Sequence, residues 1–175
     1  MARKPRPIRI EGDVAYVPLT KGYEAVIDAA DVPLVQDFHW RVMEIRRRDG
    51  SIRAIYAGSS QRSEGKRQTV YMHRVVLGVS GGFFADHRDR DGLNNRRTNL
   101  RTATPTQNAY NRIASRNNTS GAKGVTWNKS LGKWQTSIRA SGKSFHLGTF
   151  TDFKEATAAY AKACADLHGD FGRVA

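Results

Sequence analysis

The segment from residue 85 to residue 108 constrains the fold most, because turn and capping signals fix the order of its elements. A β-prone run ends at Asp86-His87, a polar loop follows, and a second short strand is expected over Leu100–Ala103. Thr104 can cap a helix that has proline at its first position and Gln107 at its third, which is a capping box. The segment therefore predicts strand, loop, strand and helix in that order.

The polar side chains of this segment suit hydrolytic chemistry. Asp86 directly precedes His87, and two asparagines, Asn99 and Asn108, follow the histidine at 12 and 21 positions. The imidazole can take a proton from water, while Asp86 and Asn108 offer oxygens to one hard divalent cation. A lone Asp-His pair is usually a loop feature, but the asparagines, the capping box and the basic neighbours favour the catalytic interpretation. Phosphodiester hydrolysis needs this combination of activated water and cation.

The charge of the chain points to a polyanionic partner. Its 175 residues hold 29 Lys and Arg against 16 Asp and Glu, a formal net charge of +13. Such a surplus fits nucleic acid before an acidic membrane, so nucleic acid is the expected partner. The length allows one ordinary domain or two small ones. The arginines in and around the loop are predicted to contact phosphates: Arg88, Arg90, Arg96, Arg97 and Arg101.

Several classes of protein are disfavoured by the composition. Cys164 is the only cysteine, which excludes an intramolecular disulfide and a Cys-rich structural zinc site. The N-terminus is basic but leads into no apolar h-region, so it is not a signal peptide. No run of 18 apolar residues is present, so no membrane span is expected. The default expectation is a soluble cytosolic protein.

Residues 8–68 are predicted to be rich in strands, with one short helix capped by Asp31. The stretch 61–68 is expected to be a basic loop. Thr69 is then predicted to cap a helix over 70–77 that ends at Gly78, with Tyr71, Val75 and Leu77 facing inward. His73 on this helix either packs or contacts a phosphate, and the packing role is preferred. The strands of this region are expected near 14–19, 23–27, 40–47 and 53–58.

The C-terminal third reads as three strands and a helix after a linker at 114–121. The strands are expected at 124–128, 133–140 and 143–150, with Ser141-Gly142 as the second turn. Asp152 can cap the helix, because Glu155 stands three residues on, and Gly169 can end it. The buried stripe of this helix is predicted to be Ala156, Ala159, Tyr160, Ala163, Cys164 and Leu167.

The strand–loop–strand–helix order, with Asp-His at the first strand and asparagine on the helix, resembles the HNH endonucleases, whose core is the ββα-metal fold. The resemblance covers about residues 71–112. It implies hydrolysis of DNA with one Mg²⁺-like ion, with His87 as general base and Asn99 as the asparagine that braces the loop and orients the histidine. Asp86 and Asn108 match the metal-ligand positions. Asparagine at the third position, where many relatives carry histidine, favours Mg²⁺ or Mn²⁺ over Zn²⁺.

Residues 120–174 resemble the AP2 DNA-binding domain, which places a three-stranded antiparallel sheet in the major groove with a helix behind. Five segments carry the resemblance in order: Gly124-Val125, Gly132-Lys133-Trp134, Ile138-Arg139, Leu147-Gly148-Thr149-Phe150, and Glu155-Ala156 with Ala159-Tyr160. Relative to plant-type AP2 domains, the groove-facing positions hold few arginines and tryptophans. Direct base readout, which leans on arginine, is therefore expected to be weaker or differently targeted.

Strand alternation divides the side chains of this sheet between two faces. One face is apolar and meets the helix; it carries Val125, Trp127, Trp134, Thr136, Ile138, Phe145 and Leu147. The other face is polar and basic and is predicted to bind DNA, together with nearby lysines that contact phosphates. These predicted DNA-binding residues are Lys123, Thr126, Asn128, Lys129, Lys133, Gln135, Ser137, Arg139, Lys143, Ser144 and His146. A solvated back of an amphipathic sheet would look similar.

The resulting expectation is an α+β chain in four parts: a β-rich DNA-contacting region (1–68), an HNH core (69–113), the linker, and an AP2-like domain (122–175). It resembles the homing-type endonucleases of phages and bacteria. One active centre per chain predicts a nick, and a monomer is expected. The alternatives are an AP2-type DNA-binding or regulatory protein without catalysis, and, more weakly, a nuclease directed at RNA.

Overall fold

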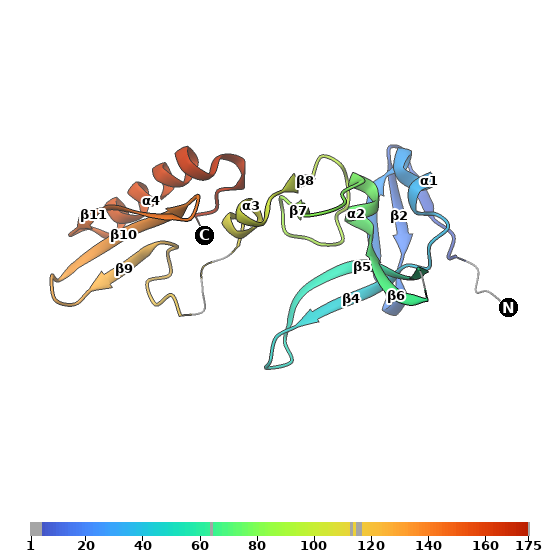
Figure 1. Cartoon of the computed structure of the whole chain (residues 1–175), viewed down its shortest axis with the longest axis horizontal. Helices are drawn as coiled ribbons and strands as arrows, with labels where there is room; N and C mark the ends of the chain where they lie inside the picture. The colour runs from blue at the N-terminus through green and yellow to red at the C-terminus, as the bar shows by residue number, and fades with distance from the viewer. Residues whose placement is uncertain (1–4, 64, 113, 115–116, 175) are drawn as a thin grey trace. The chain divides into compact units, whose positions relative to one another are not determined.

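The computed structural model describes residues 5–174 except 64, 113, 115 and 116. The chain is α+β, with several small antiparallel sheets and few helices. Its contacts divide it into two compact units, Met1–Ala103 and Thr104–Ala175 (Figure 1). Residues 1–4 of the basic N-terminus and residues 115–116 of the predicted linker lie outside the description. The four-part domain division stays a prediction. No helix in the described ranges has the length and apolarity to cross a membrane.

The first unit begins with a three-stranded antiparallel sheet, β1 (Arg9–Glu11), β2 (Val14–Pro18) and β3 (Glu24–Asp28), in the order β1-β2-β3. Alternation along β2 and β3 buries one face of this sheet in the core of the unit. Short 3₁₀ helices at Thr20–Gly22 and Ala29–Asp31 join the strands and lead to α1 (Val32–Val35). The buried side chains on the inner face are Ala15, Val17, Ala25 and Ile27.

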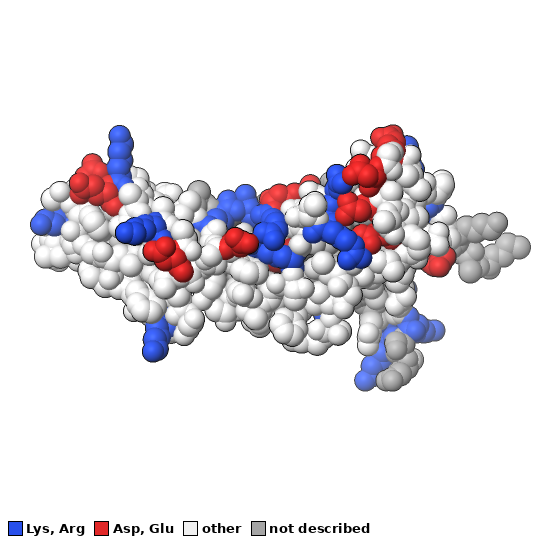
Figure 2. Space-filling model, turned by 90° about the horizontal axis from the view of Figure 1, so that it is seen from above, with Lys and Arg blue, Asp and Glu red and all other residues white. Residues whose placement is uncertain are grey.

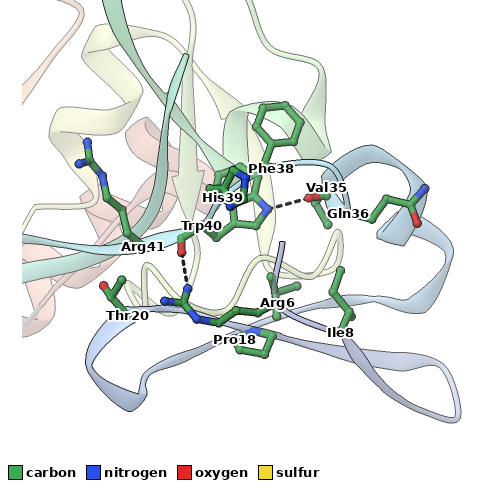
Figure 3. A pocket seen from close by; sticks show the side chains of 11 residues that line it. Arg6, Ile8, Pro18, Thr20, Val35, Gln36, Phe38, His39, Trp40 and Arg41 are labelled. Carbon is green, nitrogen blue, oxygen red and sulfur yellow. Dashed lines mark hydrogen bonds between the residues drawn. The ribbon is translucent and has the colours of Figure 1, made fainter. Parts of the chain in front are cut away.

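Trp40 lies between α1 and the next strand and connects the two segments through its hydrogen bonds. Its Nε1 donates to the Val35 carbonyl (2.8 Å), and its own carbonyl accepts from Arg6 Nη1 (3.1 Å), as Figure 3 shows. Phe38 stacks on the indole with ring centroids 4.9 Å apart. A cavity of about 200 Å³ lies beside these groups. Its described lining includes none of the predicted catalytic or metal-binding residues, so this corner belongs to the core.

A second sheet contains β4 (Arg41–Arg46), β5 (Ile52–Ser63) and β6 (Lys66–Tyr71). The long strand β5 pairs with β4 along its first half and with β6 along its second, and it changes partner at Gly58 (Figure 1). The prediction of a basic loop at 61–68 is therefore wrong, because this stretch forms a hairpin. Its residues are polar on both faces, so they show no alternation that would reveal a strand.

Helix α2 (Met72–Leu77) follows β6 directly and ends at Gly78, which adopts the left-handed conformation expected of a C-cap. The predicted end is confirmed, but the helix starts two residues later than predicted. Thr69 and Val70 belong to β6 instead. The buried face also differs from the prediction: Met72, His73 and Val76 are buried, while Val75 and Leu77 only pack against the core.

The predicted order of elements in the central segment is confirmed. β7 (Phe84–His87) pairs with β8 (Leu100–Ala103) in antiparallel fashion, and both belong to the first unit. α3 (Pro105–Tyr110) opens the second unit. Thr104 Oγ1 accepts from the Gln107 amide (3.2 Å) and Gln107 Oε1 accepts from the Thr104 amide (2.9 Å), so the capping box forms as predicted.

The rest of the second unit is a three-stranded antiparallel sheet with α4 (Phe153–His168) packed on it. The strands β9 (Val125–Asn128), β10 (Lys133–Ala140) and β11 (Lys143–Phe150) lie in the order β11-β10-β9. A 3₁₀ turn at Gly169–Phe171 follows the helix. Val125, Ile138, Ala156, Tyr160 and Cys164 form the core of this unit.

Two predictions about this core are wrong in part. Leu167 is 42% exposed and His168 is 7% exposed, because the buried stripe of α4 continues from Cys164 by a further four residues, to 168. Trp127 and Phe145, assigned to the buried face, are 47% and 41% exposed. They extend beyond the area that α4 covers, although Trp127 still packs against Trp134 with ring centroids 4.9 Å apart.

Candidate active site

The β7–β8 pair positions the candidate catalytic residues. In its register Asp86 lies opposite Arg101, and His87 lies opposite Leu100. The Arg101 guanidinium donates to Asp86 Oδ2 from Nε (2.8 Å), and its Nη2 lies 2.7 Å from the same oxygen. Both side chains are only 8% exposed. The carboxylate is therefore held by a buried ion pair, and the phosphate contact predicted for Arg101 stays a prediction.

The loop between β7 and β8 supplies a hydrogen-bond partner for His87. Asn95 is fully buried; its Nδ2 donates to the Leu93 carbonyl (3.0 Å), and its Oδ1 lies 3.3 Å from His87 Nε2. Because the Asn95 amide nitrogen donates to a carbonyl, its oxygen faces the ring, and this arrangement corresponds to the His87 tautomer with the proton on Nε2. Nδ1 is then the nitrogen that can accept a proton. Asn95 was not predicted, since one more asparagine in a polar loop carries no distinguishing signal.

His87 is kept neutral by its surroundings. Burial lowers its pKa below the usual value, although the hydrogen bond with Asn95 and the carboxylates of Asp89, Asp86 and Asp91 act in the opposite direction. A neutral imidazole is the form that can act as a general base.

Aromatic rings enclose one side of His87. The rings of Tyr56 on β5 and His73 on α2 lie with centroids 5.9 and 5.0 Å from its ring, and His73 also stacks on Tyr71 at 5.5 Å. A Cβ at Gly92 would overlap the Tyr56 ring, so glycine lets the loop approach β5 closely. These rings pack against the imidazole from the side.

His73 is a buried member of this cluster, which fits the packing role preferred for it. It is 9% exposed, and burial lowers its pKa from 6.5 to about 3, so it is neutral. Its Nδ1 is buried and has no hydrogen-bond partner in the described part of the chain. Its ring packs edge-on against His87, at an interplanar angle of 84°.

Asn99 braces the loop. Its Nδ2 donates to Asp89 Oδ1 (2.9 Å) and to the Asn94 carbonyl (2.7 Å), and its Oδ1 accepts from the Asp89 amide (3.1 Å). Its own carbonyl accepts from the Arg88 amide (2.9 Å), which closes the base of the loop. These contacts are those of a loop brace, as the family resemblance implies for this position. A catalytic role for Asn99 stays a prediction.

Two loop arginines tie the loop to the N-terminal region. Arg96 donates to Asp28 (2.7 Å) and to Asp13 (2.8 Å), while Arg97 donates through Nε and Nη2 to Asp31 (3.0 and 2.7 Å). Asp31 is 3% exposed, so Arg97 pairs with a buried carboxylate. Their predicted phosphate contacts stay predictions. Arg88 is exposed on the same loop.

Backbone contacts complete this attachment. The Val26 amide donates to the Leu93 carbonyl (2.8 Å), and the Val26 carbonyl accepts from the Asn95 amide (2.7 Å). The loop thus runs along the edge of β3, with one parallel bridge between Val26 and Asn94. The N-terminal sheet therefore positions the loop that contacts His87, a role for residues 8–68 that the sequence did not reveal.

The donor set for a metal ion consists of oxygens. Arg101 binds Asp86 through Oδ2. Asn108 lies on α3 in the second unit and is partly buried. No group of three or more His, Cys, Asp or Glu that could hold a metal occurs in the described ranges. Carboxylate and amide oxygens are donors that suit Mg²⁺, which keeps several waters. The metal-ligand roles of Asp86 and Asn108 stay predictions.

In the second unit, the sheet face opposite α4 is polar. The register places Thr126 beside Gln135, Ser137 beside His146, and Arg139 beside Ser144. None of the three strands contains Asp or Glu. The face that carries α4 shows both signs of charge instead (Figure 2). Lys129, Lys133 and Lys143 are exposed at the turns and strand ends of this sheet, while Asn128 Oδ1 accepts from the Ser130 and Leu131 amides (both 3.1 Å).

Lys123 has a different environment from the other predicted DNA-binding lysines. Its Nζ donates to the carbonyls of Tyr110 (2.7 Å) and Arg112 (2.9 Å), and burial lowers its pKa. The Tyr110 ring stacks on His168 with centroids 3.7 Å apart, and its hydroxyl accepts from the Ser141 amide (2.8 Å). Lys123 thus fastens α3 within the second unit, and its phosphate contact stays a prediction.

Two known proteins align with about half of this chain. The chain is 36% identical over 95 residues to protein 3.8 of Escherichia phage T7, a match that spans 54% of this chain and 78% of that protein. It is 28% identical over 93 residues to a protein of Acanthamoeba polyphaga mimivirus named uncharacterized HNH endonuclease L560, spanning 53% of this chain and 47% of that relative. No family profile and no solved structure matches. The identity and coverage of the first match show that the chain belongs to the same family as protein 3.8 of phage T7.

Proposed function

We propose that the chain is a metal-dependent HNH endonuclease of the homing type, which hydrolyses a phosphodiester of duplex DNA and nicks one strand. The observation that carries the proposal is the His87–Asn95 hydrogen bond beside the buried Asp86–Arg101 pair. It fixes the tautomer of a neutral imidazole next to a carboxylate. The similarity to a mimivirus protein named an HNH endonuclease and the net charge of +13 support the same function.

His87 acts as general base in this proposal. Its Nδ1 accepts the proton of the attacking water, while Nε2 keeps its own proton and its hydrogen bond to Asn95 Oδ1. The ring therefore does not rotate as it becomes charged. Tyr56 and His73 hold the ring from the side. General-base catalysis of this kind contributes about 10²- to 10⁴-fold to a rate.

Asp86 and Asn108 are the proposed ligands of one Mg²⁺, with Mn²⁺ as an alternative. When bound, such a cation would neutralise charge on the phosphate and on the leaving 3′ oxygen. Arg101 orients the Asp86 carboxylate through Oδ2. The products are proposed to carry 5′ phosphate and 3′ hydroxyl, as the family chemistry implies.

The second unit is proposed to be an AP2-like DNA-binding module that acts as part of a monomer. Its sheet presents polar and basic side chains on the face away from α4, and this face suits a major groove. Arg139 is exposed on this face near the end of β10 and is the side chain best suited to reach guanine. Lysines at the turns would contact phosphates and position the module.

Incubation with supercoiled plasmid separates this function from that of a DNA-binding protein without catalysis. We expect relaxed circles with Mg²⁺ and none with EDTA, and we expect His87→Ala to abolish them. His39→Ala is the matched control, because His39 is an exposed histidine of the same unit outside the site. Tight binding without relaxation in Mg²⁺ or Mn²⁺ would overturn the endonuclease proposal. Competition by RNA would test the alternative substrate.

A further inference from the structure

The outer part of the β5–β6 hairpin, residues 59–70, is here called the ribbon. Ser59 at its root is 2% exposed, whereas Gln61, Arg62, Lys66, Arg67 and Gln68 are all exposed. Successive residues of one strand point to opposite faces, so both faces of the ribbon meet solvent. A two-stranded hairpin of this kind is marginally stable in water by itself. The ribbon therefore contributes little to the stability of the fold, which suggests that its surface binds a partner.

Like charges meet on this ribbon. Arg62 lies directly opposite Arg67 in the register, and Lys66 lies opposite Ser63. Like charges in this position destabilise a sheet by a few tenths of a kcal/mol. The sequence from 59 to 70 contains one acidic residue, Glu64. Within the described residues, no carboxylate pairs with Arg62, Lys66 or Arg67. An anionic partner would relieve the repulsion.

The ribbon also presents a hollow of suitable chemistry. Its volume is about 450 Å³, and it is lined by Ser60, Gln61, Arg62, Gly65 and Arg67. This lining combines hydrogen-bond donors with two guanidinium groups, which bind phosphate oxygens in a bidentate manner. Figure 2 shows Lys and Arg side chains gathered on a protruding part of the first unit, where we identify this hairpin.

The root of the ribbon is part of the candidate active site. Tyr56 on β5 packs against His87, and Tyr71 at the end of β6 stacks on His73. Arg62 follows Tyr56 by six positions, which corresponds to about 20 Å along a strand. Base pairs in duplex DNA follow one another at about 3.4 Å, so this distance spans roughly six base pairs.

We propose that the ribbon binds the backbone of duplex DNA within about six base pairs of the scissile bond, with Arg62 and Arg67 on phosphates and Lys66 beside them. The placement of the cut rests on the proposed function; the DNA binding itself does not. A two-stranded ribbon fits the major groove, so its tip can approach phosphates on both sides of that groove. The ribbon thereby fixes which bond of a bound duplex reaches His87.

The test uses the full chain, a short fluorescent DNA duplex and EDTA, so that no cutting occurs. Arg62→Gln with Arg67→Gln is compared with Lys154→Gln with Lys162→Gln, which removes the same charge from α4. We expect the ribbon variant to bind about tenfold more weakly, and its slope of log K against log salt to fall by about 2, since each phosphate contact contributes about 0.9. Equal affinities and slopes in the two variants would overturn the proposal.

A hydroxyl-radical footprint tests the placement. The ribbon variant should lose protection within about six base pairs of the nick and keep it elsewhere. Loss of protection only at more distant positions would overturn the placement. The two proposals fail separately: a wild-type chain that binds but never cuts, with the ribbon variant binding weakly, refutes the endonuclease and keeps the ribbon. A ribbon variant that binds like the α4 control refutes the ribbon, whether or not the chain cuts.

Discussion

The surroundings of His87 and the ribbon use the same residue types in opposite ways. Arg101 is 9% exposed and is bound to Asp86, whereas Arg62 and Arg67 are exposed and face each other. A guanidinium that pairs with a buried carboxylate supports the fold, because removing either partner destabilises the protein. A guanidinium opposite another guanidinium is available to a polyanion. The net charge of +13 is therefore divided between structural and binding roles.

The largest expected effect is on stability, at the buried pair. Arg101→Ala leaves Asp86 as a buried charge that has lost its ion-pair partner and should lower the free energy of unfolding by about 3–5 kcal/mol. Urea unfolding measures it, with Arg67→Ala as the control that removes an exposed arginine. Equal stability of the two variants would show that the buried Arg101 and the exposed Arg67 contribute alike to the fold, which contradicts the comparison.

The next effect is on catalysis. Asn95→Ala removes the hydrogen bond to His87 Nε2, so the ring can rotate and change tautomer. We expect the nicking rate at saturating DNA to fall about 100-fold, within the range for a general base, while DNA affinity stays at the wild-type value. Asn94→Ala changes a neighbouring amide that contacts Asp89, and it should affect the rate less. A wild-type rate in Asn95→Ala would show that the ring is oriented by other contacts.

Acid should destabilise the buried cluster and not the ribbon. The pKa of His73 is about 3 when folded and about 6.5 when unfolded. Between these values the unfolded chain binds the extra proton, so stability is complete above pH 6.5 and is lost as the pH falls. The loss contributed by His73 should approach 1.4 kcal/mol per pH unit. Unfolding of His73→Phe at several pH values should show a shallower dependence; an unchanged slope would mean that His73 is protonated in the folded protein.

The smallest effect is expected at the ribbon. Arg62→Gln with Arg67→Gln removes a repulsion, so the free energy of unfolding should stay constant or rise by about 0.5 kcal/mol. Thermal unfolding checks this value. A clear loss of stability would mean that these arginines support the fold, and the comparison with Arg101 would fail.

Local signals explain what the sequence predicted well. The capping box at Thr104 and Gln107, the strand at Leu100–Ala103 and the glycine that ends α2 were all predicted at residue level. Each depends on side chains that contact their own neighbours in the chain. The ribbon was missed because its strands are polar on both faces and pair only with each other.

Long-range partners explain what the sequence left open. The carboxylates that bind Arg96 and Arg97 lie 66 to 83 residues away in the sequence, and no local sequence pattern predicts these pairs. The same is true of Asn95, whose role depends on the packing of its loop against β3. The sequence identified Asp86 and His87 as neighbours on one strand, but it did not reveal what holds either side chain.

The central claim is that His87 removes a proton from water in a protein that binds DNA through other residues. Single-turnover nicking of supercoiled plasmid at saturating protein and Mg²⁺ tests it most directly. We expect His87→Ala to bind DNA like the wild type and to cut about 10²- to 10⁴-fold more slowly. Equal cutting by His87→Ala and the wild type would contradict the account.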